Sequence, residues 1–166
     1  MTAKEIQTQV IKDHLKPLMK KSGYQTSALT WWKDKGDFYT LINLQNYSWN
    51  AKDSVDFCFN VGIVLKALIK GKKPTHFDLN VYLRENFFLP SDRQEYAYRN
   101  KTGYRIDSVT SLHNFAREIE IDFSQYILTS LDSLNSLNDC IDRFKDVVYP
   151  GLSLEQIVEK NGLIIE

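Results

Sequence analysis

The first twenty residues repeat apolar side chains at helical spacing. Thr2 can cap a helix, because Glu5 follows three residues later and completes a capping box. The pattern predicts a helix over about residues 3–21, kinked at Pro17 and ended by Gly23 as a left-handed cap. The apolar positions that define its buried face are Ile6, Val10, Leu15, Leu18 and Met19.

After Tyr24 the period changes to two, which is typical of strands. A turn at 34–37 separates a run that ends at Trp31 and Trp32 from a second run over 38–45, so a hairpin is expected. A third strand follows, since apolar and polar positions alternate from Val55 to Ile63. The side chains expected to face the core are Phe57, Phe59, Val61 and Ile63, whereas Asp56 and Asn60 should face away.

The middle of the chain gives weaker signals. We expect a strand over 77–83 and a second hairpin, with strands at 96–99 and 104–106 around a turn at 100–103. The helical period returns from Val109 to Leu134.

Two capping boxes then predict further helices, at Ser136 with Asp139 and at Ser153 with Gln156. The order predicts an α+β fold: an N-terminal helix, an antiparallel sheet of about four to six strands and a helical C-terminal third. No linker or internal repeat divides the chain, so residues 1–166 should form a single globular domain.

Charge and composition exclude several classes of protein. The 21 basic residues balance 21 acidic ones, so no global field favours nucleic acid or a membrane surface as partner. Cys58 and Cys140 belong to no cluster with metal spacing and are expected to be free thiols. There is no long apolar segment, and the cytoplasm is the expected compartment.

Four stretches of the first 64 residues resemble one bacterial family, the domains of unknown function numbered 4304. The matching stretches are 14–18 with Gly23 and Tyr24, 31–33, 42–45 and 57–63. They are fold markers and not catalytic signatures, so the resemblance implies the fold and carries no activity across.

Candidate catalytic and metal-binding residues are scarce. The three histidines, His14, His76 and His113, lack the spacing of a metal site, and no Gly-x-Ser-x-Gly elbow is present. Asp139, Asp142 and Asp146 could share a helix face, which is more often a solvated surface than a metal site. We therefore predict no catalytic residue, no metal and no cofactor.

The aromatic residues are the most suggestive feature. Trp31, Trp32, Tyr47 and Trp49 gather near two strand ends and are the candidate binding residues. Trp31 and Trp32 must point to opposite faces of a strand. If the aromatics serve an interface, at least one of the three tryptophans should be exposed; the alternative is that helices on both faces bury them.

Two functions are compatible with these features. The first is a non-enzymatic interaction protein that binds another protein through an aromatic-rimmed sheet face or the acidic helix, for example as a bacterial immunity protein or antitoxin. The alternative is a small-molecule-binding protein or enzyme with Gln45, Asn60 and Arg84 in a cleft on the sheet. The sequence leaves the oligomeric state open.

Overall fold

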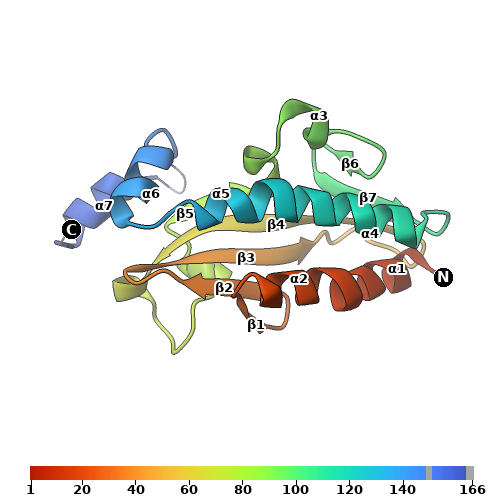
Figure 1. The fold of residues 1–166 in the computed structure, drawn as a ribbon, viewed down its shortest axis with the longest axis horizontal. Helices are drawn as coiled ribbons and strands as arrows, with labels where there is room; N and C mark the ends of the chain where they lie inside the picture. Colours follow the sequence, from red (N-terminus) through yellow and green to blue (C-terminus); the bar gives the residue numbers. More distant parts are fainter. Residues whose placement is uncertain (149–150, 164–166) are drawn as a thin grey trace.

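The protein is built on one antiparallel sheet. In a computed structural model, which describes residues 1–148 and 151–163, six strands follow the order β1-β2-β3-β4-β7-β6, and a seventh, β5, pairs with β4 (Figure 1). This confirms the α+β class; the sheet has one strand more than the expected range, and β1 and β6 are very short. The strands are β1 Gln25–Ser27, β2 Thr30–Asp34, β3 Phe38–Asn46, β4 Ser54–Leu65, β5 Val81–Arg84, β6 Arg99–Asn100 and β7 Gly103–Asp107.

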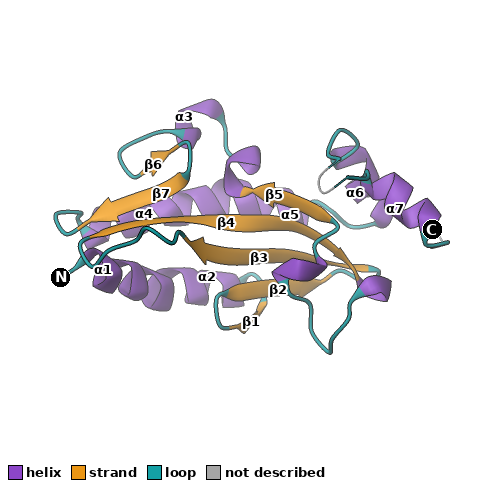
Figure 2. Ribbon diagram, turned by 180° about the vertical axis from the view of Figure 1, so that it is seen from behind, coloured by secondary structure: helices purple, strands orange, loops and turns teal. Residues whose placement is uncertain are grey.

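Two long helices lie side by side on one face of the sheet (Figure 1). In the view turned by 180°, the opposite face of the sheet lies in front of these helices (Figure 2). Each is a continuous helix with a wider π-helical turn inside it. The first consists of α1 Ala3–Val10, η1 Ile11–Leu15 and α2 Lys16–Lys21; the second consists of α4 Leu112–Ile121, η5 Asp122–Ile127 and α5 Leu128–Asp132.

The remaining helices are short. They are the α-helices α3 Ser91–Gln94, α6 Leu137–Arg143 and α7 Leu154–Lys160, and the 3₁₀ turns η2 Lys66–Leu68, η3 His76–Asp78 and η4 Glu85–Phe88. The predicted capping boxes at Ser136 and Ser153 are both present. Within the described residues, no helix is long and apolar enough to cross a membrane.

The first helix begins and ends as its sequence predicts. Thr2 and Glu5 form the capping box, and Gly23 has a φ of 89°, the left-handed conformation that glycine adopts without strain. Pro17 sits inside the helix without ending it. The preceding turn widens instead, and Lys16 N–H donates to the carbonyl of Ile11, because a wider turn relieves the clash that a proline ring makes with the turn before it.

The alternation along β4 decides which side chains the helices cover. Phe57, Phe59, Val61 and Ile63 belong to the core beneath the two long helices, as predicted. Asp56 and Asn60 point to the opposite face, also as predicted, yet both are buried there. The second face of the sheet is therefore not a plain solvated surface.

Four local predictions were wrong. The second hairpin is present, but its first strand is Arg99–Asn100 and not 96–99. The segment 77–83 is not one strand, because Phe77 lies in the 3₁₀ turn η3 and only Val81–Arg84 pairs with β4. The second long helix starts at Leu112, after a turn that leaves Val109 exposed. Helix α6 ends at Arg143, so Asp146 does not continue an acidic helix face.

Candidate binding face

The face of the sheet opposite the long helices has an apolar part and a polar part. On the apolar part, Trp32, Leu41 and Val64 are covered by Ile69 and Leu79 from the segment between β4 and β5. The polar part is called the open face below. Its side chains are Asn43, Gln45 and Tyr47 at the end of β3, Trp49, then Asp56, Cys58 and Asn60 on β4, and Arg84 on β5.

A hydrogen-bonded ladder crosses the open face. The Arg84 Nη1 donates to Asn60 Oδ1 at 2.8 Å, to Gln45 Oε1 at 3.2 Å and to the sulfur of Cys58. Asn60 Nδ2 donates to Asn43 Oδ1 at 3.1 Å. The register of three strands thus brings together Gln45, Asn60 and Arg84, the residues expected for a small-molecule cleft. Their polar atoms already bind each other, which fixes the floor of the face.

An aromatic platform stands beside this ladder. The rings of Tyr47 and Trp49 stack with centroids 4.4 Å apart and planes 9° apart. Trp49 Nε1 donates to Asp56 Oδ2 at 3.0 Å, and the Tyr47 hydroxyl donates to the carbonyl of Thr102 at 2.6 Å. Burial raises the pKa of Tyr47 to about 12, so this hydroxyl stays a donor at neutral pH. Trp49 is nevertheless 60% exposed.

A second exposed ring lies on the other side of the ladder. Asn43, Gln45, His76, Phe77, Leu79 and Tyr82 line a pocket of about 540 Å³. Phe77 is 87% exposed and its ring centroid lies 4.0 Å from that of His76. Two large apolar rings therefore flank a polar floor on one face of the molecule.

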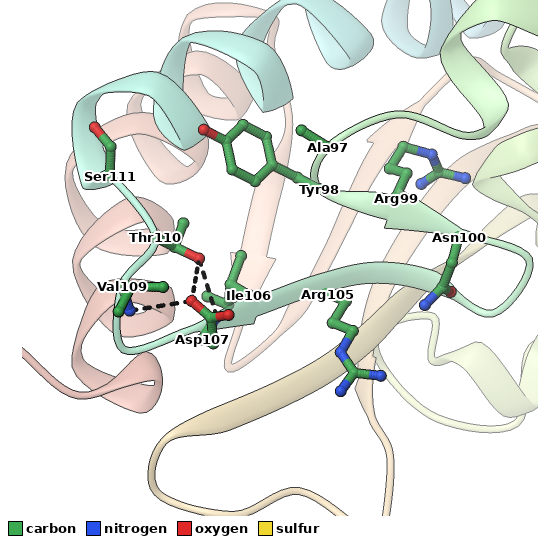
Figure 3. A pocket seen from close by; sticks show the side chains of 10 residues that line it. All are labelled: Ala97, Tyr98, Arg99, Asn100, Arg105, Ile106, Asp107, Val109, Thr110 and Ser111. Carbon is green, nitrogen blue, oxygen red and sulfur yellow. Dashed lines mark hydrogen bonds between the residues drawn. The ribbon is translucent and has the colours of Figure 1, made fainter.

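The open face also carries basic side chains that form no ion pair within the part of the chain that the structure describes. Arg105 is the β-sheet partner of Asp56, so its side chain lies on the same face; Figure 3 shows it extending away from Tyr98. Lys101 follows β6 and lines a small pocket with Tyr47 and Arg84. Among the residues that the structure describes, none of Arg84, Lys101 and Arg105 forms an ion pair.

A hollow of about 570 Å³ lies at this edge, where β6 and β7 meet the start of α4, and Arg105 is among the residues that line it (Figure 3). Its carboxylate is used locally, because Asp107 accepts from Val109 N–H at 3.0 Å and from Thr110 Oγ1 at 3.1 Å. In the described ranges no group of three His, Cys, Asp or Glu residues could hold a metal ion. Among the described residues, this hollow therefore contains no metal site, and its carboxylate is already hydrogen-bonded.

Two buried polar clusters hold this end of the sheet together. Glu85 fills the gap where β4 passes from β7 to β5, accepting from Phe59 N–H at 3.1 Å and from Arg99 Nη1 at 2.9 Å. Asp122 in the π turn η5 accepts from an Arg93 nitrogen at 2.7 Å and from the hydroxyls of two tyrosines. Because these carboxylates have their partners, we assign them a structural role.

The four aromatic residues predicted for binding do not form one exposed cluster. Trp31 is 1% exposed beneath the helices and Trp32 is 7% exposed under the segment after β4. Tyr47 and Trp49 do come together, and the exposure of Trp49 confirms that at least one tryptophan is solvent-accessible. Sequence reasoning missed Phe77 and Arg105, because Phe77 lay in an expected strand and the place of Arg105 depends on strand pairing.

The other candidate residues have ordinary roles. His14 Nδ1 lies 2.6 Å from Glu120 on the neighbouring helix. Cys58 and Cys140 are buried free thiols, and burial raises the pKa of both, that of Cys140 to about 12. Asp139 serves the capping box of α6. None of these groups is placed for nucleophilic chemistry.

A family model described as a domain of unknown function (DUF4304) matches residues 15–133. The match extends well beyond the residues that carry the sequence resemblance. It includes all seven strands, the open face and the second long helix. No curated protein and no solved structure matches the chain.

Proposed function

The chain belongs to the DUF4304 family of domains of unknown function, and we propose that it acts by binding another protein, without catalysis, through the open face of its sheet. The observation that carries this proposal is the aromatic platform. Trp49 is fixed by a ring stack and a hydrogen bond, yet leaves more than half of its surface in water. A ring held rigidly before binding loses little conformational entropy when a partner covers it.

Phe77 extends the same surface. Isolated exposed aromatic rings are common, but two rings that flank a structured polar floor resemble the anchors of an interface. The ladder of Arg84, Asn60 and Gln45 would then orient the partner, since hydrogen bonds at an interface fix its register.

The charge of the face favours an acidic partner. Arg84, Lys101 and Arg105 have no ion pair with any of the described residues, so carboxylates of a partner would gain contacts without displacing an existing pair. The partner therefore presents an apolar side chain to Trp49 or Phe77 and flanking Asp or Glu residues to the arginines. In its most specific form the proposal places the protein in the bacterial cytoplasm as an immunity protein or antitoxin.

A small-molecule ligand is the second candidate, favoured by the pocket of about 540 Å³ beside Gln45. It ranks lower because the polar side chains of the floor already bind one another. A small ligand would have to displace these contacts to be recognised.

Peptide display tests the protein-binding function and does not require that the partner be identified first. Random peptides are selected on the immobilised protein and counter-selected on the bare support. We expect enriched sequences that combine a large apolar residue with Asp or Glu. Their affinity should fall by about tenfold or more in Trp49→Ala and in Arg105→Glu, as for central interface residues.

Val148→Ala is the matched control, because Val148 is also exposed but lines neither the pocket with Phe77 nor the hollow with Arg105. It should leave peptide affinity unchanged. Enriched peptides that bind Trp49→Ala as tightly as the unaltered protein, or that carry basic residues in place of acidic ones, would contradict the proposal.

A further inference from the structure

A second groove lies on the other side of the molecule, between the first long helix and the edge strand β1. Its volume is about 480 Å³. Trp31 faces the helices, so this groove is separated from the open face by the sheet itself. The residues that line it are Lys12, Lys16, Pro17, Lys20, Tyr24, Gln25, Thr26 and Trp31.

Three lysines form one wall of the groove. Lys12, Lys16 and Lys20 follow each other at intervals of four residues, so they lie one turn apart on the same side of the helix. In the part of the chain that the structure describes, none of the three has an ion pair or a side-chain hydrogen bond, and no carboxylate lines the groove. Three exposed lysine side chains without a counter-charge thus form this wall of the groove.

The floor of the groove contains an unsatisfied donor. Trp31 lines the groove and is almost completely buried. Its Nε1 is the one buried side-chain nitrogen or oxygen among the described residues without a hydrogen-bond partner. The neighbouring Tyr24 hydroxyl, in contrast, pairs with Thr40 Oγ1 at 2.9 Å. Because this nitrogen is itself covered, a ligand in the groove contacts the ring of Trp31 and reaches the nitrogen only if the floor moves.

We infer that this groove binds a soluble organic phosphate. A phosphate group brings close to two negative charges and three acceptor oxygens, which matches three unpaired ammonium groups on one wall. The organic part would lie against Pro17, Tyr24 and the apolar stems of the lysines. The inference is independent of the proposed protein-binding face.

Nuclear magnetic resonance of the three indole N–H groups gives a direct test. The signals of Trp31, Trp32 and Trp49 are assigned from the spectra of Trp31→Phe and Trp49→Phe. We expect titration with AMP to shift the Trp31 signal saturably while the Trp49 signal stays in place. Adenosine, which lacks the phosphate, should produce no saturable shift.

Two lysine variants on the same helix complete the test. Lys16→Gln should weaken AMP binding by about tenfold, the effect of losing one charged hydrogen bond. Lys4→Gln removes the same charge outside the groove and should leave the affinity unchanged. Circular dichroism melting of both variants confirms that they are folded.

The inference is overturned if AMP leaves the Trp31 signal unmoved, if adenosine binds as well as AMP, or if both lysine variants lose affinity equally. A lipid phosphate is the other source of the same chemistry. Binding to vesicles of phosphatidylcholine with phosphatidic acid, lost in Lys16→Gln and without any response to AMP, would also overturn the assignment to a soluble ligand.

Discussion

Replacing Phe59 by alanine should remove one of the main contacts between the sheet and the second long helix. The ring is fully buried. Its centroid lies 4.8 Å from that of Phe123 on the helix and 5.9 Å from those of Phe57 and Tyr104, all nearly edge-on. Truncating a buried Phe costs about 3–5 kcal/mol, a range that already includes its ring contacts, and the three edge contacts of Phe59 place it at the upper end. We therefore expect a loss of about 5 kcal/mol.

Urea unfolding followed by circular dichroism measures this loss. Phe77→Ala is the matched control, because the same atoms are removed from a ring that is 87% exposed; it should change stability by less than about 0.5 kcal/mol. If Phe59→Ala does not fold, Phe59→Leu should still fold and lose about 1.5 kcal/mol. Similar losses of stability for the alanine variants of Phe59 and Phe77 would contradict the burial of Phe59 beneath the helices.

Three further predictions concern buried groups. Gly62→Ala should detach β5 or prevent folding, because a Cβ would lie 1.7 Å from a carbonyl oxygen of β5. The control Gly71→Ala should have the same melting temperature as the unaltered protein. In the folded protein, Cys58 and Cys140 should resist iodoacetamide at mildly alkaline pH, since burial raises the pKa of both thiols, and both should react in guanidinium. Rapid alkylation of both thiols in the folded protein, detected by mass spectrometry, would disprove this. Asp122→Ala should cost about 3–5 kcal/mol in urea unfolding, because it removes one of the two carboxylates of Arg93 and the acceptor of two tyrosine hydroxyls. A loss below about 1 kcal/mol would show that the cluster contributes little.

Much of the fold could be predicted because its signals are local. Alternation along β4, the capping box at Thr2 and the glycine at position 23 each depend on residues close in sequence, and all three predictions are confirmed. The segment over 77–83 failed because its apolar residues do not share one environment: Leu79 covers Trp32, while Phe77 remains in water. No local pattern distinguishes these two outcomes.

The candidate face depends on pairing between distant strands. Gln45, Asn60 and Arg84 meet because β3, β4 and β5 align in one register, and the sequence does not give that register. The burial of Trp32 could not be predicted for the same reason. Its direction, opposite to Trp31, follows from strand geometry, but its burial depends on a segment more than thirty residues later.

Photo-crosslinking in the cell tests the binding face most directly. A photoreactive phenylalanine derivative is placed at Phe77 or, as a control, at Val148, an exposed position that lines neither the pocket with Phe77 nor the hollow with Arg105. We predict one adduct of defined mass from position 77, with an acidic protein, that disappears when Arg105→Glu is added. Position 148 should give no such adduct. Equal adducts from both positions, or an adduct at position 77 that survives Arg105→Glu, would contradict the account.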